Sequence, residues 1–108
     1  MESSQAEITQ QNQQRYLMSG VVDFSTAQAL LRQSEALFSA AGNSENKTLV
    51  MDLSQVQECN SSVLALMLEM AENARQQAIE IHFENLPTVV FTIAKAYGVE
   101  NEIREICQ

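Results

Sequence analysis

The sequence predicts one α/β domain with a small, mostly parallel sheet, an opening hairpin and helices packed on the sheet. Three observations predict this class. Apolar residues recur at helical spacing from residues 25, 63 and 87 onward, and residues 48–51 and 79–84 resemble strands. After two opening strands, helices alternate with strands along the chain. The 108 residues suffice for one core. We therefore expect a single domain over residues 1–108, with residues 1–5 flexible.

The opening strands are short and largely polar. We expect an edge strand at residues 6–10, a turn at 11–13 and a second strand at 15–19, which Gly20 breaks. The first helix is expected to begin at Ser25, because Ser25 and Gln28 have the spacing of a capping box. An apolar stripe follows it, and Gly42 and Asn43 are expected to end the helix.

The middle of the chain is expected to hold the central strand and a second helix. Residues 48–51 are apolar without alternation, which is typical of a strand buried on both faces. Residues 52–54 are expected to end this strand. Residues 55–62 are mostly polar and precede a helix over residues 63–77. Leu66 and Met70 make the apolar side of that helix wider than one sheet face requires, so we expect them at a partner surface.

The last third of the chain is expected to hold one strand and two helices. Residues 79–84 alternate strictly between apolar and polar, as in a half-buried strand. Pro87 suits the first turn of the following helix, and Gly98 is expected to end it. A short helix over residues 100–106 completes the chain.

Charge and hydropathy exclude several classes of function. Six Lys and Arg against fourteen Asp and Glu give a net charge of −8, which argues against nucleic acid and anionic lipid as partners. The longest apolar run, residues 63–68, is far shorter than the roughly 20 residues of a membrane span, so we expect no membrane insertion and no signal peptide. Cys59 and Cys107 are too few for a disulfide framework and indicate a cytoplasmic protein.

The sequence shows no recognisable catalytic apparatus. His82 is the one histidine, and no nucleophile elbow supports a triad with Asp52 and Ser61 or Ser62. Cys59, His82 and Cys107 lack the spacing of metal ligands, and no glycine-rich phosphate loop is present. We therefore expect no enzyme activity, no metal and no cofactor.

The segment Asn60-Ser61-Ser62 is the one local feature with two interpretations. Asn and Ser are favoured helix caps, which suffices to explain them. A hydroxyl at a helix N-terminus is also a place where a phosphate would meet free N–H groups and a favourable dipole.

Here the sequence resembles the STAS family, the sulfate-transporter and anti-sigma-factor-antagonist domain. The resemblance rests on the strand at residues 49–54, which contains Asp-Leu-Ser, and on residues 59–68, with further likeness at residues 19–23 and 92–98. It covers about residues 6–106, and within the family it is greatest to the small STAS subunit of the Mla phospholipid transporter. That likeness implies a cytoplasmic, non-catalytic subunit, peripheral to the inner membrane, that binds the ATPase of an ABC transporter maintaining outer-membrane lipid asymmetry.

The resemblance also implies a role for Ser61. It lies at the position of the functional Thr of that subunit and of the phosphorylated Ser of anti-sigma-factor antagonists, so the alternative is an antagonist regulated by phosphorylation of Ser61. Asn60 replaces the usual Asp and Ser62-Val63 a more glycine-rich pair, which weakens kinase recognition more than binding. The expected partner-binding residues are Cys59, Asn60, Ser61, Ser62, Leu66 and Met70.

Overall fold

The computed structural model describes residues 6–41 and 47–107 and confirms the predicted α/β class. The sheet has four strands in the order of the chain, β1 (Ala6–Gln10), β2 (Arg15–Val22), β3 (Thr48–Cys59) and β4 (Glu80–Glu84). The β1–β2 pair is antiparallel, and β2–β3 and β3–β4 are parallel. The opening hairpin and the mostly parallel sheet are therefore as predicted.

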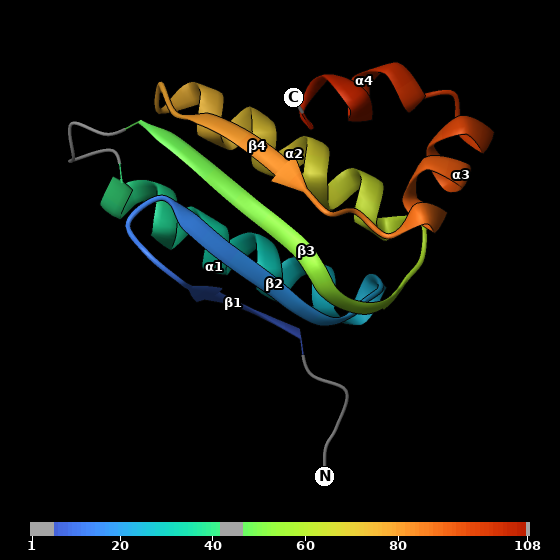
Figure 1. The fold of residues 1–108 in the computed structure, drawn as a ribbon, viewed down its shortest axis with the longest axis horizontal. Helices are drawn as coiled ribbons and strands as arrows, with labels where there is room; N and C mark the ends of the chain where they lie inside the picture. The colour runs from blue at the N-terminus through green and yellow to red at the C-terminus, as the bar shows by residue number, and fades with distance from the viewer. Residues whose placement is uncertain (1–5, 42–46, 108) are drawn as a thin grey trace, which may run out of the picture.

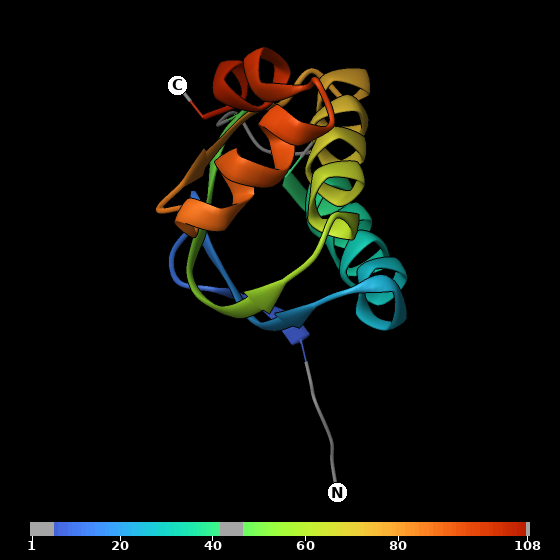
Figure 2. The same ribbon diagram turned by 90° about the vertical axis from the view of Figure 1, so that its right-hand side faces the viewer.

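Four helices lie on one side of this sheet (Figures 1 and 2). They are α1 (Phe24–Ala41), α2 (Ser62–Gln76), α3 (Thr88–Ala96) and α4 (Glu100–Glu105). The helices α1 and α2 cover the sheet, and α3 and α4 pack beside α2 near the β4 edge. The core lies between the two layers, and its fully buried members include Met18, Phe38, Leu53, Met67 and Phe83.

The strand β2 continues through Gly20, contrary to the prediction that Gly20 breaks it. Gly20 has a φ of 98°, and the pairing of β2 with β3 shifts register on either side of it, between Leu17 and Ser19 and between Gly20 and Val21. Glycine adopts positive φ without a steric penalty, so an irregularity here bends the strand without ending it.

The strand β3 is also longer than predicted and reaches Cys59. The expected end at Asp52–Ser54 is where β4 stops pairing, because β4 pairs only with Thr48 to Asp52. Beyond that point β3 pairs with β2 alone, and Gln55, Gln57 and Glu58 are exposed while Val56 is buried. A strand segment that pairs on one side only tolerates polar side chains. The same polar side chains make this segment resemble a loop in the sequence.

The helix α1 begins one residue before Ser25, and its cap is Asp23. The Asp23 carboxylate accepts hydrogen bonds from the backbone N–H groups of Ser25 (2.9 Å) and Thr26 (3.2 Å), and the Thr26 hydroxyl accepts one from the Asp23 N–H (3.0 Å). This reciprocal cap replaces the predicted Ser25–Gln28 box, since Asp is as good a cap as Ser. The predicted end at Gly42 and Asn43 lies outside the described residues, as does the segment 1–5.

The remaining predicted elements agree closely with the structure. The helix α3 begins directly after Pro87, and Gly98, with a φ of 77°, follows its last turn. There the Gly98 and Val99 N–H groups donate to the carbonyls of Lys95 (3.1 Å) and Ala94 (2.9 Å). This left-handed ending is the one that glycine favours. In the described part of the chain, no helix is long and apolar enough to cross a membrane.

Candidate partner-binding site

The turn between β3 and α2 is held in place by Asn60. Its N–H donates to the Val22 carbonyl (3.1 Å), which ties the end of β3 to the end of β2. Its side-chain oxygen accepts hydrogen bonds from the Ser62 N–H (2.9 Å) and the Ser62 hydroxyl (2.6 Å). Asn60 thus stabilises the start of α2, a role that needs a side-chain oxygen and no charge.

Ser61 and Ser62 have different environments although they are neighbours. Ser62 is 6% exposed and its hydroxyl is bonded to Asn60. Ser61 is half-buried, its carbonyl accepts from the Leu64 N–H (3.1 Å), and its hydroxyl makes no cap hydrogen bond. Within the described residues the Ser61 hydroxyl therefore has no part in holding the fold and is available to another molecule.

The electrostatic setting of Ser61 favours negative charge. The first turn of α2 contains no acidic residue, and Asn60 adds none beside it. The N-terminus of a helix carries a partial positive charge from its free N–H groups. A phosphate or carboxylate at Ser61 would therefore be tolerated by the isolated domain.

A shallow apolar groove of about 450 Å³ lies next to this turn, between the first turns of α1 and α2. Phe24, the first residue of α1, lies at its edge with 77% of its surface exposed. Ala65 and Leu66 of α2 contribute to the opposite side. A large exposed aromatic beside a concave apolar surface is typical of protein interfaces.

Phe24 is the residue of this surface that sequence reasoning missed. The predicted helix begins after it, so Phe24 falls in a loop and off the apolar stripe. With Asp23 as the cap, Phe24 becomes the first helical residue and its side chain lies away from the core. An aromatic that directly follows a cap and fits no core stripe is the signal that could have identified it.

Met70 belongs to the core, which corrects its expected place on a partner surface, whereas Leu66 is a core residue that also lines the groove between α1 and α2. Leu66 is 3% exposed and Met70 is 0% exposed. The two lie one helical turn apart on α2, and the contact of α2 with α1 continues at Asn73, whose amide donates to Glu35 (3.5 Å). The apolar side of α2 is wide because it packs on α1 as well as on the sheet.

Cys59 ends β3 and is half-buried. Burial raises the pKa of its thiol, so the thiol stays protonated near neutral pH and is a poor nucleophile. Among the residues that the structure describes, no three His, Cys, Asp or Glu side chains gather as metal ligands would. His82 contacts Glu80 (Nε2 to Oε2, 3.1 Å).

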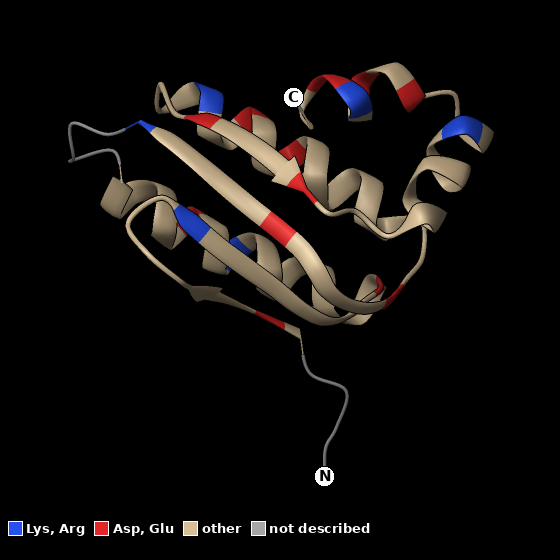
Figure 3. Ribbon diagram, viewed as in Figure 1, with Lys and Arg blue, Asp and Glu red and all other residues tan. Residues whose placement is uncertain are grey.

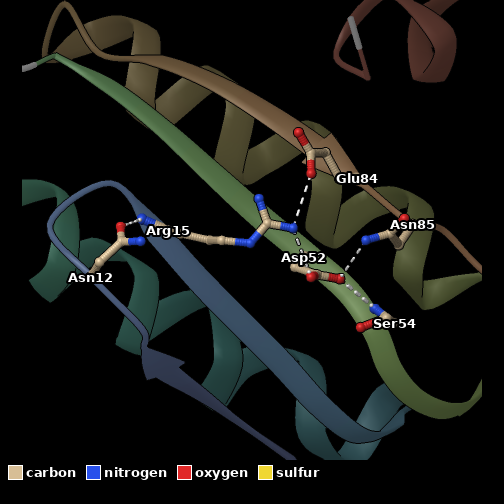
Figure 4. A network of polar contacts seen from close by, with 6 residues as sticks. All are labelled: Asn12, Arg15, Asp52, Ser54, Glu84 and Asn85. Atoms are coloured by element: carbon tan, nitrogen blue, oxygen red, sulfur yellow. Dashed lines mark hydrogen bonds and ion pairs between the residues drawn. The ribbon is translucent and has the colours of Figure 1, made fainter.

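The second polar cluster lies on the open face of the sheet and joins three strands (Figure 4). Arg15 of β2 contacts the carboxylates of Asp52 on β3 (2.9 Å) and Glu84 on β4 (3.0 Å). The other Asp52 oxygen accepts from the Ser54 N–H (2.8 Å) and the Asn85 amide (3.1 Å). Burial opposes ionisation of Asp52, but these hydrogen bonds outweigh it and lower its pKa to about 2.

This cluster braces the sheet, and its carboxylate is fully engaged. Both Asp52 oxygens are bonded, to Arg15, Ser54 and Asn85.

Of the expected site residues, the structure brings together Cys59, Asn60, Ser61 and Ser62 at one turn. It buries Met70 away from them, and Leu66, although 3% exposed, lines the same groove as Ser62.

The fold and this helix-capping turn define a small α/β module with a half-buried serine hydroxyl, free of a cap hydrogen bond, at a helix N-terminus. A family model described as "Mlab, STAS domain" matches residues 9–106, so the chain belongs to the STAS domain family. STAS domains mediate protein–protein interactions and are in general not enzymes. No curated protein sequence matches the chain.

Solved structures share the fold at low sequence identity. The anti-sigma factor antagonist SpoIIAA in its unphosphorylated form is similar with a TM-score of 0.66 and 11% identity, over 90% of this chain and 84% of SpoIIAA. A protein named Mglu is similar with a TM-score of 0.56 and 17% identity, over 75% of this chain and 19% of that protein.

Proposed function

We propose that this STAS domain is the accessory subunit that binds and regulates the ATPase of a phospholipid-transport ABC system. In this role it is cytoplasmic and is held at the inner membrane through its partner. The observation that carries the proposal is the Ser61 hydroxyl, which makes no cap hydrogen bond. Ser61 directly precedes Ser62, which lines an apolar groove together with exposed Phe24. The match to the Mlab family model supports the choice of partner.

The contact surface we propose consists of Ser61, Ala65 and Phe24 around the groove between α1 and α2. Asn60, Ser62 and Cys59 support it by fixing the turn. The apolar part of the surface supplies binding energy, and the Ser61 hydroxyl supplies a polar contact at its centre. No step of this function needs a cofactor or a metal.

The second candidate is an anti-sigma-factor antagonist whose Ser61 is phosphorylated. The similarity to unphosphorylated SpoIIAA favours it. Asn60 weakens it, because the carboxylate that family kinases meet beside the hydroxyl is absent here. Phosphate on Ser61 of the protein purified from its native cell, together with binding of an anti-sigma kinase to the unphosphorylated form alone, would replace the first proposal with this one.

The test compares four variants in a complex with the ABC ATPase subunit. Ser61→Asp is expected to weaken binding strongly, because a charge desolvated in a packed contact costs several kcal/mol unless a basic group pairs with it. Phe24→Ala is expected to weaken binding at least tenfold, and Ser61→Ala to reduce ATPase stimulation more mildly. Thr9→Asp, which adds the same charge on exposed β1, serves as the matched control.

The measurements are native mass spectrometry of the complex and ATPase rates. Each variant is first shown to melt near the wild type, as expected when the Ser61 hydroxyl has no structural partner. Ser61→Asp that binds and stimulates as well as the wild type would place Ser61 outside the interface and overturn the proposed surface.

A further inference from the structure

A second groove lies at the other end of α2, away from Ser61. It has a volume of about 770 Å³ and is bounded by the C-terminal half of α2, by β4 and by α4. Its walls combine apolar side chains with glutamates; Ile79, Ile81 and Ile106 are among the former, and Glu102 and Glu105 among the latter. We call it the acidic groove.

The acidic groove is lined by four glutamates, of which Glu80 contacts His82 (3.1 Å) and Glu72 contacts an arginine. Its one arginine, Arg75, is paired with Glu72. Arg104, the one cation of α4, bonds Glu100 (2.8 Å) and lies 5.0 Å from the centre of the Phe91 ring. Glu102 and Glu105 are exposed and have no ion pair within the described residues. Figure 3 shows acidic residues on β4, α2 and α4 around this part of the molecule.

The groove also contains one backbone N–H at the sheet edge that the described part of the backbone leaves unpaired, that of Ile81, a residue 7% exposed. The Glu80 N–H donates to the carbonyl of Lys47 (2.7 Å), the residue before β3. Backbone groups alternate in direction along a strand, so those of Ile79, Ile81 and Phe83 point away from β3. The Ile79 N–H bonds the Ala74 carbonyl (2.8 Å), and the Phe83 N–H bonds the Ile106 carbonyl (2.9 Å). Between them the Ile81 N–H has no backbone partner among the described residues.

We propose that the acidic groove binds an extended basic segment of another protein, in which Lys or Arg alternates with apolar residues. The apolar side chains contact the floor, the cations pair with Glu102 and Glu105, and the Ile81 N–H donates to the segment's backbone. A second copy of this chain does not fit the groove, because its six Lys and Arg are isolated, the nearest two in the sequence being Lys95 and Arg104.

This surface is separate from the Ser61 surface, so the two can be occupied together. Ser61 precedes the first turn of α2, whereas the groove begins at Leu68 on that helix and extends to α4. The proposal therefore does not depend on the ABC ATPase as partner, and its test is independent of Ser61.

The probe is a fluorescein-labelled peptide of alternating Arg and Val, with alternating Glu and Val and alternating Arg and Ser as controls. Fluorescence anisotropy is expected to show binding of the Arg–Val peptide that weakens at high salt, with at least tenfold weaker binding of both control peptides. The double variant Glu102→Lys, Glu105→Lys is expected to weaken binding of the Arg–Val peptide at least tenfold. The double variant Glu7→Lys, Glu58→Lys, at exposed positions of β1 and β3, changes the net charge equally and is expected to bind within twofold of the wild type.

Amide chemical shifts of the wild-type protein locate the peptide without any substitution. The largest changes are expected at Ile81 and at residues 102–106. Ser61→Asp and Phe24→Ala are expected to bind the peptide as the wild type does, which separates this site from the proposed ATPase contact. Equal binding of the Arg–Ser peptide, or shift changes centred elsewhere, would overturn the proposal.

Discussion

Replacing Asp52 with Asn tests the brace on the open face of the sheet. The substitution keeps the volume of the side chain and removes its charge. The Asp52 pKa falls from 3.8 to about 2 in the folded state, and a difference of this size corresponds to about 2 kcal/mol of stability. The side chain is only 10% exposed, so solvent screening reduces this figure little.

The sign of the pH dependence follows from the direction of the shift. A carboxyl whose pKa is lower in the folded state stabilises the fold above its unfolded pKa, and this stabilisation is lost as the pH falls through the folded value. Wild-type Asp52 should therefore contribute fully at pH 7 and decreasingly between about pH 4 and pH 2. At pH 3 about half of the roughly 2 kcal/mol should be left.

The assay is urea unfolding of wild type and Asp52→Asn at pH 7, 4 and 3. The difference in unfolding free energy should be about 2 kcal/mol at pH 7 and about 1 kcal/mol at pH 3. Glu84→Gln is the control and should have a smaller effect, because Glu84 is 44% exposed and its pair with Arg15 is solvated. A difference that is the same at all three pH values would mean that the introduced amide disturbs packing, and the electrostatic argument would be refuted.

Three further substitutions test the core, the cap and a strained residue. Leu66→Asp should unfold the isolated domain in thermal melts followed by circular dichroism, since an unpaired charge at a 3% exposed position costs several kcal/mol; a folded variant would mean that Leu66 is not core. Asn60→Ala should cost about 1 kcal/mol and lower Tm by roughly 4–8 °C, and an unchanged Tm would assign the cap to another group. Ala78→Gly should raise stability by up to about 1 kcal/mol in urea unfolding, because Ala78 has a φ of 59°; a loss would show that its methyl group contributes packing.

The sequence predicts most elements of this fold because their apolar periods are strong. The alternation at residues 79–84 and the stripe of α2 each have one physical interpretation, and both are confirmed. Gly98 is correctly predicted as a helix end because its local geometry depends on glycine alone.

The misses occur where tertiary context decides between local alternatives. The second half of β3 is polar because only β2 pairs with it, and a one-dimensional pattern does not show how many neighbours a strand has. Asp23 and Ser25 are both good caps, and the choice between them depends on where β2 ends. The same choice removed Phe24 from the predicted helix and so from the candidate site.

The capping turn at residues 60–62 is predicted from the sequence, but the roles of its individual side chains are not. Asn60, Ser61 and Ser62 are identified as a capping turn, and the structure distinguishes their roles by hydrogen bonds that involve positions as distant as Val22. Leu66 and Met70 show the limit of counting apolar residues on a helix. The additional apolar residues of α2 are buried against a second helix, α1. The spacing of apolar residues within α2 does not show that α1 packs there.

The order of the strands has a consequence for how the chain folds. Each strand pairs with the next one along the sequence, so every parallel pair requires closure of a single crossover containing one helix. The entropic cost of closure grows with the length of the chain between paired segments, and here no crossover contains more than one helix. No strand has to be inserted between two that are already paired, so the sheet can grow from its first hairpin in one direction. We therefore expect the chain to fold fast for a parallel sheet and to acquire its strands in the order in which a ribosome releases them.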